Sequence, residues 1–328
     1  MLRIMGHSAT AILCFMAVCV EAAHYASAAE PSIQLTVARL TLPGAITAIL
    51  DPLKAQMIDR RHGIDLVVKD YSTVATFYAA TSTGEVEMSV AGPWILQRLR
   101  NDGARIVGVF TFVGVASLGV VTGDASLRTV RDLKGKTIAA DMGSSEYQLL
   151  AMYGRSQGLE FGRDVTVVQA TPPLARTQLN AGRVDAAMSW ETNTTLLLGD
   201  NPAYRRIFGG ETAWAALASS DTHGWQLLVT LHEDAIKRNA EIVPRLMEMW
   251  RDAARFLTEH TEEAEAIDEK TVKLPKGVLS QALGSKRLVY DIQPVWGSER
   301  AGLEQSFKLS VASGFAATLP DSRILYKP

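Results

Sequence analysis

The chain has 328 residues, enough to bury one or two hydrophobic cores, and its formal net charge at pH 7 is −2. This balance of charges argues against a general nucleic-acid-binding surface. Both cysteines, Cys14 and Cys19, fall near the N-terminus, in the segment described next. We therefore expect neither a disulfide nor a cysteine-based metal site in the mature chain.

Residues 1–29 have the pattern of a secretory signal peptide. Arg3 precedes an apolar run over residues 9–20, and the small residues Ala26-Ser27-Ala28-Ala29 follow as a cleavage site. An N-terminal membrane anchor is the alternative, but the apolar run is short for a bilayer. We expect cleavage after Ala28 or Ala29 and export of the mature chain.

From Ile33 onward, short apolar strands alternate with amphipathic helical segments. Strands are predicted over residues 33–40, 64–69, 86–91, 104–111, 117–122, 136–141, 165–170, 184–190 and 225–230. Helices are predicted over residues 44–61, 73–83, 93–101, 145–157 and 174–181. This alternation is typical of an α/β protein with open, mostly parallel sheets that helices cover on both faces.

After Gly224 the pattern changes to one strand followed almost entirely by helices. These helices are predicted over residues 241–260, 262–270, 275–286 and 298–313. A helical tail after two α/β units suggests two lobes, with the chain returning to the first lobe to complete it. We place lobe 1 at residues 30–116 plus 225–328 and lobe 2 at residues 117–224. The crossings, near Val115–Gly119 and Ser219–Trp225, could serve as hinges.

The turn Gly143-Ser144-Ser145 lies between a predicted strand and a predicted helix. The start of a helix presents backbone N–H groups and the positive end of the helix dipole, which suit a small anion. Alternatively, Ser144 or Ser145 only caps the helix, which serine does well.

Four motifs carry a resemblance to a known family: Gly84–Trp94, Val130–Ala139, Gly143–Ser145 and Ala181–Glu191. With them the chain resembles periplasmic substrate-binding proteins of ABC importers. The most similar branch includes the sulfonate, taurine and nitrate binding proteins and the thiamine-pyrimidine precursor binding proteins. The resemblance implies a type II binding-protein fold, in which two lobes joined by a two-strand hinge close on one ligand without chemistry. It also implies a periplasmic monomer without a cofactor, whose partners are the ligand and the permease subunits, and which meets the membrane only through that permease.

Ligands of open α/β sheets bind beyond the carboxyl ends of the strands. The candidate ligand-binding residues therefore follow the predicted strands; they are Arg39, Thr41, Gly92, Trp94, Gly143, Ser144, Ser145, Thr171, Trp190 and Glu191. Arg39 and the serine turn favour an acid group on the ligand, whereas Glu191 suggests an amine or a zwitterion.

Four more of the candidates have a structural alternative. Arg39 could be a surface arginine, Trp94 a core residue, and Glu191 an acid at a helix N-terminus, where the dipole favours it. Trp190 could pack between the lobes instead of forming a wall of the site.

The function that we expect is capture of a small polar ligand, anionic or zwitterionic, and its delivery to an ABC permease. An enzyme on the same scaffold, acting on a small sulfur- or pyrimidine-containing molecule, is the alternative, because a fold does not fix a function. A sensor subunit would need the same closing pocket. The histidines are scattered (His62, His223, His232 and His260), and we find no metal motif, phosphate-binding loop or nucleophile elbow.

Overall fold

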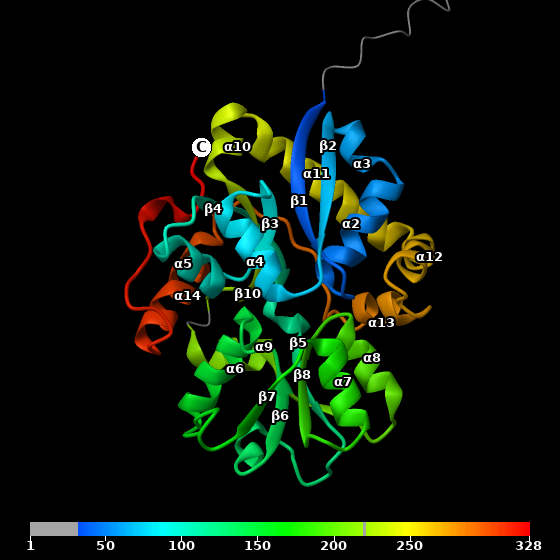
Figure 1. Cartoon of the computed structure of the whole chain (residues 1–328), viewed down its shortest axis with the longest axis vertical. Coiled ribbons are helices and arrows are strands. Elements are labelled where there is room, and N and C mark those ends of the chain that lie inside the picture. Colours follow the sequence, from blue (N-terminus) through cyan, green and yellow to red (C-terminus); the bar gives the residue numbers. More distant parts are fainter. Residues whose placement is uncertain (1–31, 219–220) are drawn as a thin grey trace, which may run out of the picture.

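The computed structural model describes residues 32–218 and 221–328, which form two α/β lobes. Each lobe contains one five-stranded sheet, with the strand orders β2-β1-β3-β10-β4 and β7-β6-β8-β5-β9. We call the part built on the first sheet lobe 1 and the part built on the second lobe 2. In Figure 1 lobe 1 is the upper half and lobe 2 the lower half.

Lobe 1 is assembled from both ends of the described chain. Its strands are β1 (Ile33–Leu40), β2 (Ile64–Tyr71), β3 (Met88–Ala91), β4 (Ile106–Gly114) and β10 (Trp225–His232). Its helices are α2 (Ala45–Ala55), α3 (Ile58–Arg61), α4 (Val74–Thr83), α5 (Pro93–Asn101), α10 (Glu233–Arg238), α11 (Ile242–Glu259), α12 (Thr261–Thr271), α13 (Val278–Gly284) and α14 (Arg300–Ala312).

Lobe 2 is one continuous stretch of chain. Its strands are β5 (Leu118–Thr122), β6 (Thr137–Ala140), β7 (Thr166–Gln169), β8 (Ala186–Trp190) and β9 (Arg205–Gly209). Its helices are α6 (Ser145–Ser156), α7 (Pro172–Asn180), α8 (Asn193–Asp200) and α9 (Gly210–Leu217), together with the 3-10 turn Val130–Leu133.

The chain crosses between the lobes in two neighbouring segments. The first is the 3-10 turn Val115–Ser117 between β4 and β5, and the second joins α9 to β10. The N–H of Val115 donates to the carbonyl of Gly224 at 3.0 Å, so the two crossings are hydrogen-bonded to each other. Two adjacent short crossings are the usual arrangement for hinge motion between lobes.

Each sheet is covered on both faces by helices, and each face has its own apolar core. In lobe 1 the helices α2 and α11 cover one face, where Leu50 and Trp250 are fully buried. The other face packs on α5 and α14. In lobe 2 a small-residue core with Ala139 and Ala187 separates the sheet from α7 and α8.

Most predicted elements are confirmed to within a few residues, and Pro244 lies in the first turn of α11, where its missing N–H costs nothing. One expectation is wrong and one region was missed. The helix expected over residues 44–61 is broken at Met57, whose φ is 52°. No elements were predicted over residues 193–217, where α8, β9 and α9 form. The expectation of mostly parallel sheets is confirmed, because in each sheet one strand alone, β10 or β5, runs antiparallel to its neighbours.

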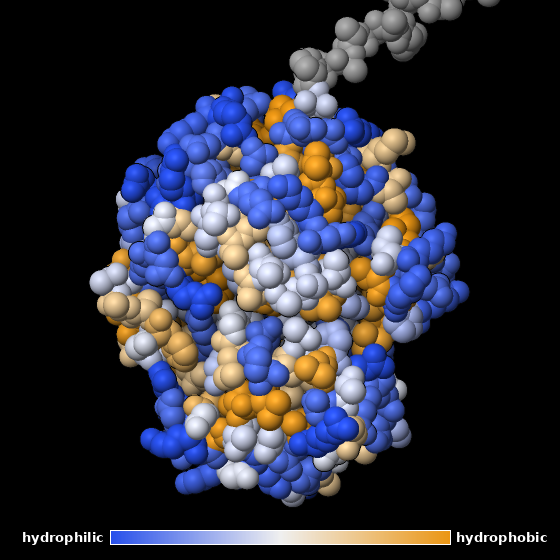
Figure 2. Space-filling model, in the orientation of Figure 1, coloured by the Kyte–Doolittle hydropathy of each residue, from blue (hydrophilic) through white to orange (hydrophobic). Residues whose placement is uncertain are grey.

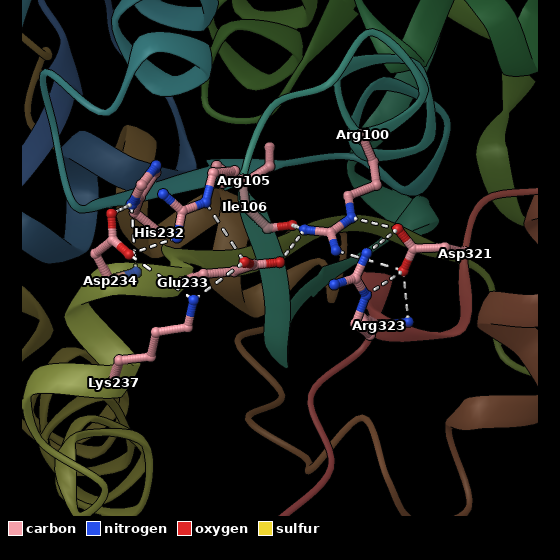
Figure 3. Close-up of polar contacts among 9 residues, drawn as sticks. All are labelled: Arg100, Arg105, Ile106, His232, Glu233, Asp234, Lys237, Asp321 and Arg323. Atoms are coloured by element: carbon pink, nitrogen blue, oxygen red, sulfur yellow. Dashed lines mark hydrogen bonds and ion pairs between the residues drawn. The ribbon is translucent and has the colours of Figure 1, made fainter.

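A charged cluster holds the C-terminal segment against lobe 1 (Figure 3). Arg100 on α5 is 8 % exposed and pairs with Glu233 at 2.6 Å and with Asp321 at 3.1 Å. It also donates to the carbonyl of Ile106 at 3.1 Å. One buried guanidinium thus connects α5, the start of α10 and the last residues of the chain, as its planar fork of donors allows.

The predicted signal peptide, residues 1–29, lies outside the described residues, as do both cysteines. No helix between residues 32 and 328, in the parts described, is long and apolar enough to cross a membrane. The described residues also contain no group of three or more His, Cys, Asp or Glu side chains that could hold a metal ion.

Candidate functional site

The facing edges of the two lobes enclose a cavity of about 50 Å³, which we call the inner cavity. On the scale where one water needs about 10–15 Å³, it has room for roughly four water-sized groups. Lobe 1 and lobe 2 both contribute to its lining, which consists of Leu40, Leu42, Pro43, Gly44, Ala45, Ile46, Val74, Phe77, Tyr78, Val90, Ser144, Glu146, Trp190, Gln226 and Leu227. A largely apolar wall with a few placed polar groups is typical of a small-molecule site.

Lobe 1 presents the start of α2 to the inner cavity. Gly44 is the residue before the helix, and its N–H donates to Thr47 Oγ1 at 3.0 Å. The next residues, Ala45 and Ile46, line the cavity, and the first turn of α2 contains no acidic side chain. Because first-turn amides have no acceptor within their own helix, this end of α2 offers N–H donors and a positive dipole end.

Lobe 2 presents the turn 141–146, where our sequence-based expectation needs correction. Ser144 caps α6 by accepting from the N–H of Tyr147 at 3.2 Å. The N–H of Gly143 donates to Asp141 Oδ1 at 3.1 Å, and that of Met142 donates to Gln169 Oε1 at 2.9 Å. We expected the amides just past Met142 to be free for a ligand, but acceptors of the protein itself occupy these two.

Glu146, in the first turn of α6, puts a buried carboxyl group in the wall of the inner cavity. Its side chain is 7 % exposed, and Oε1 accepts from Gln226 Nε2 at 2.6 Å. Gln226 in turn accepts from the hydroxyl of Ser117 in the first crossing segment. Burial raises the pKa of Glu146, and the nearby Asp141 carboxylate adds to that rise.

Trp190, at the end of β8, forms an aromatic wall opposite Gly44. The residue is 8 % exposed, and its Nε1 lies 3.3 Å from the point that a Cβ on Gly44 would occupy. Its N–H makes no hydrogen bond with any residue of the described chain. The indole N–H is therefore available as a hydrogen-bond donor to a ligand.

A second hollow, the outer groove, adjoins the inner cavity, and the two share Val74 and Tyr78 as lining residues. Its volume is about 670 Å³, and Arg98 and Asp102 of lobe 1 face Gly143 and Thr171 of lobe 2 across it. Figure 2 shows the surface narrowing where the two lobes meet. The outer groove thus lies beside the inner cavity, at the contact between the lobes.

Two polar side chains of lobe 1 in the outer groove are available to a ligand. Arg98 forms no ion pair with a described residue, so its guanidinium can attract an acid group. The Tyr78 hydroxyl likewise has no hydrogen-bond partner among these residues, and burial raises its pKa. The Tyr78 O–H therefore stays protonated at neutral pH and can donate a hydrogen bond.

The other candidate residues lie elsewhere. Arg39 forms ion pairs with Asp51 and, at 2.7 Å, with Asp70, and it does not line the inner cavity. Thr41 is exposed and its N–H donates to the carbonyl of Tyr71 at 2.9 Å. Trp94 is 1 % exposed and donates to the carbonyl of Ser306 at 2.9 Å, within the core.

Gly92 and Ser145 contact each other across the lobes. A Cβ on Gly92 would lie only 2.1 Å from Ser145 Oγ, so the approach requires glycine. The same hydroxyl accepts from the N–H of Ile95 at 3.4 Å. The structure thus places this pair at the contact between the lobes.

Glu191 lies at a second interlobe contact. Its carboxylate is buried, and Oε1 pairs with Arg287 Nε at 2.5 Å. Arg287 Nη2 also donates to Thr195 Oγ1 at 2.8 Å. Nearby, Asn193 Nδ2 donates to the carbonyl of Pro43 at 2.6 Å. Lobe 2 is therefore fastened to lobe 1 beside the inner cavity, where α8 contacts α13 (Figure 1).

Of the residues that line the inner cavity, the candidate set contained Ser144 and Trp190. Among those it missed are Gly44, Tyr78, Glu146 and Gln226. Glu146 directly follows the serine turn, so the turn was a signal in the sequence for a site at this position. Gln226 is the second residue of a strand that we predicted, but its neighbours are apolar and give no sign of a site.

Comparison with known proteins identifies the family of this chain. Residues 60–264 match the model of the family described as NMT1/THI5 like. The chain belongs to the NMT1/THI5-like family. This confirms the branch that the four sequence motifs indicated.

One relative in Escherichia coli (strain K12) is named "Putative aliphatic sulfonates-binding protein". It is 26 % identical over 230 residues, which cover 69 % of this chain and 67 % of the relative.

Two solved structures share the fold. The periplasmic aliphatic sulphonate binding protein of Escherichia coli aligns with a TM-score of 0.73 at 20 % identity, covering 90 % of this chain and 92 % of that one. The alkanesulfonate-binding protein of Xanthomonas axonopodis pv. citri, bound to MOPS, aligns with a TM-score of 0.75 at 21 % identity, covering 92 % and 100 %. These similarities confirm the two-lobed periplasmic-binding-protein fold.

Proposed function

We propose that this protein is the solute-binding component of an ABC importer, that it works in the periplasm, and that it captures one small polar organic molecule in the inner cavity. Family membership and the sulfonate-binding relatives support this role. The observation that carries it is the cavity itself, which both lobes line and whose wall includes Trp190, with an indole N–H that has no partner in the described chain.

The proposed mechanism is closure of the lobes around the ligand. A ligand that touches Gly44 on one side and Trp190 on the other bridges two bodies connected by short crossings. Its differential contacts would favour the closed arrangement over an open one. The closed form would then be the species that the permease subunits recognise.

The proposed contacts with the ligand are the following. The start of α2 and Trp190 would donate hydrogen bonds, Ser144 and Glu146 would face the ligand from lobe 2, and Arg98 and Thr171 would guide entry through the outer groove. Arg39, Thr41 and Trp94 are left out of this set, because their side chains are engaged within lobe 1 or exposed away from the cavity. Gly92, Ser145 and Glu191 would act by shaping the closed form.

The test uses a substitution whose side chain would fill part of the inner cavity. In Gly44→Val the new side chain would project toward Trp190, because a Cβ there already lies 3.3 Å from its Nε1. The control is Gly199→Val on α8, where a Cβ meets nothing within 4 Å. Thermal unfolding is measured with a panel of alkanesulfonates, taurine, nitrate, aromatic carboxylates and aminopyrimidines.

We expect at least one panel member to stabilise the wild type, by about 2.7 kcal/mol at a hundred times its dissociation constant. Gly44→Val should lose this stabilisation while Gly199→Val keeps it. A stabilisation that Gly44→Val retains in full would contradict binding in the inner cavity. The absence of any response across the panel would contradict the proposed ligand class.

A further inference from the structure

A third hollow, the hinge pocket, lies at the two crossings between the lobes. Its volume is about 470 Å³, which is within the usual range of small-molecule sites. Both crossings, α9 of lobe 2 and the segment 289–291 of lobe 1 contribute to it. Its lining consists of Gly114, Val115, Ala116, Glu211, Trp214, Ala215, Thr222, His223, Gly224, Trp225, Val289 and Asp291. Capture of a solute in the inner cavity makes no use of this pocket.

The crossings separate the hinge pocket from the inner cavity, and the two hollows share no lining residue. Along β10 the lining changes hollows between Trp225, which lines the hinge pocket, and Gln226, which lines the inner cavity. In the first crossing Ala116 lines the hinge pocket, whereas the hydroxyl of Ser117 donates to Gln226. A rotation of the lobes about the crossings therefore moves the walls of the two hollows in opposite senses.

The two walls of the hinge pocket belong to different lobes. On the lobe 2 side, Trp214 of α9 packs on the second crossing, where a Cβ on Gly224 would lie 2.6 Å from its Cγ. On the lobe 1 side, the N–H of Asp291 donates to the carbonyl of Phe112 on β4 at 3.0 Å. The width of the hinge pocket therefore depends on the angle between the lobes.

The charged groups of the hinge pocket favour a cation. None of its lining residues is a lysine or an arginine. Glu211 is neutralised by Arg206 at 2.6 Å, and His223 Nδ1 lies 3.2 Å from Glu299 Oε2. Asp291 forms no ion pair with a described residue. The pocket thus holds one carboxylate that lacks a counter-ion.

Two indole rings complete the lining. The N–H of Trp214 donates to the carbonyl of Thr222 at 2.9 Å, and that of Trp225 donates to Glu299 Oε2 at 3.1 Å. Because both N–H groups are engaged, what these rings can offer to a ligand is apolar surface and the negative face of the π system. Such surface suits the apolar body of an organic cation.

We infer that the hinge pocket is a second binding site, which takes a small organic ammonium ion with an aromatic or alkyl body. The ammonium group pairs with Asp291 of lobe 1, and the body packs on Trp214 of lobe 2 and on Trp225. This site goes beyond the proposed function, which concerns the inner cavity alone.

An occupant of the hinge pocket acts on the inner cavity through the angle between the lobes. In the arrangement that the structure shows, the lobes are joined beside the inner cavity by the ion pair of Glu191 and Arg287. Opening the inner cavity would bring the walls of the hinge pocket together. A molecule that fits this pocket as it stands therefore opposes opening, and it raises the affinity of the inner cavity for its own ligand.

The first experiment titrates the full chain with amines by calorimetry. The probes are phenethylamine and tryptamine, and their counterparts without a positive charge are 2-phenylethanol and 3-phenylpropionate. Asp291→Asn removes the charge and keeps the oxygen that accepts from Gln293 Nε2 at 2.8 Å. Its control is Asp102→Asn, which removes a negative charge from the outer groove instead.

A second variant tests the same site without touching Asp291. Val289→Lys places a positive charge in the hinge pocket at a side chain that is 47 % exposed, so folding should tolerate it. The matched control is Val67→Lys on β2, where the valine is 37 % exposed and does not line the pocket. Thermal unfolding without any probe shows that each variant is folded.

We expect the wild type and both controls to bind at least one amine about tenfold or more tightly than its counterparts, as a hydrogen bond between charged groups provides. Asp291→Asn and Val289→Lys should each weaken that binding by a similar factor. Saturating amine should also raise the affinity of the wild type for the panel compound that stabilises it most, by about fivefold or more. Asp291→Asn should show no such rise at the same amine concentration.

The inference fails if neither amine binds, or if both variants bind the amines as their controls do. Amine binding that leaves the affinity of the inner cavity unchanged, or lowers it, would contradict the coupling between the two hollows. If no panel compound binds, the proposed function fails, and the amine titrations still decide for or against the hinge pocket.

Discussion

Trp190 has two separable roles at the inner cavity, as an apolar wall and as a hydrogen-bond donor. Trp190→Phe keeps most of the wall and removes the N–H. We predict that ligand affinity falls about tenfold, the worth of one hydrogen bond at the upper end of the usual range. Titration calorimetry with the best ligand measures it.

The matched control is Trp296→Phe, because Trp296 lies in lobe 1 against Tyr326 and does not line the cavity. The control should bind as the wild type does. Unchanged affinity in Trp190→Phe would show that the indole N–H does not contact the ligand.

The sequence predicted where some residues of the inner cavity lie, but not what they do there. Ser144 and Trp190 do line the cavity, and they could be named because they follow strands. In the sequence, Glu146 cannot be told apart from an ordinary acid in the first turn of a helix, where the dipole favours one. Its place in the site depends on the hydrogen bond from Gln226, which lies 80 residues away in sequence and contacts Glu146 only in the folded chain. The ion pair between Glu191 and Arg287 spans 96 residues and was equally invisible.

The contact between α2 and α12 contains a second buried acid. Asp268 on α12 is fully buried, and neither of its carboxyl oxygens has a hydrogen-bond partner in the described chain. Burial, together with the nearby Asp51 and Glu265, raises its pKa from 3.8 to about 8. Between these two values the folded chain holds a proton that the unfolded chain has lost.

The folded state is therefore predicted to lose stability as pH rises from about 4 to about 8, by about 1.4 kcal/mol per pH unit from this group in the middle of that window. Asp268→Asn, which cannot ionise, should flatten the curve and be the more stable protein at pH 8. Urea unfolding over that range measures the free energy of unfolding. Glu269→Gln, one residue further and exposed, is the control. Parallel curves for the wild type and Asp268→Asn would refute the assignment.

Elements with clear periodicity were predictable, and those with diluted signals were not. The apolar pattern of β1 and the proline at the first position of α5 marked their elements well. Helix α8 begins with threonines and α9 begins at a pair of glycines, and these residues have weak helix propensity. Both helices therefore depend on packing in lobe 2. The direction of β10 and β5 depends on how the chain re-enters each sheet, which local pattern does not encode.

At the scale of the whole molecule, the interlobe contact of Arg287 bears on the balance between open and closed forms. Removing Arg287 leaves the buried Glu191 carboxylate without its partner, which costs about 3–5 kcal/mol in a closed interface. Opening of the lobes would return Glu191 to water and relieve that cost. We predict that Arg287→Ala has a larger radius of gyration without ligand and binds ligand more weakly, because closure becomes less favourable.

Small-angle X-ray scattering measures the radius of gyration, and titration measures the affinity for the ligand. The control is Arg176→Ala, which breaks an ion pair with Asp200 at a similar distance of 2.5 Å but within lobe 2. Equal compactness of Arg287→Ala, Arg176→Ala and the wild type would contradict a role of this contact in closure.

The central claim is that one small molecule binds between the lobes and touches both of them. The most direct measurement is a crystal structure of the protein with the panel compound that stabilises it most against thermal unfolding. We predict electron density for the ligand in the inner cavity, in contact with Ala45 of lobe 1 and Trp190 of lobe 2. Density on the outside of either lobe, or an empty inner cavity at a ligand concentration that saturates binding in solution, would contradict it.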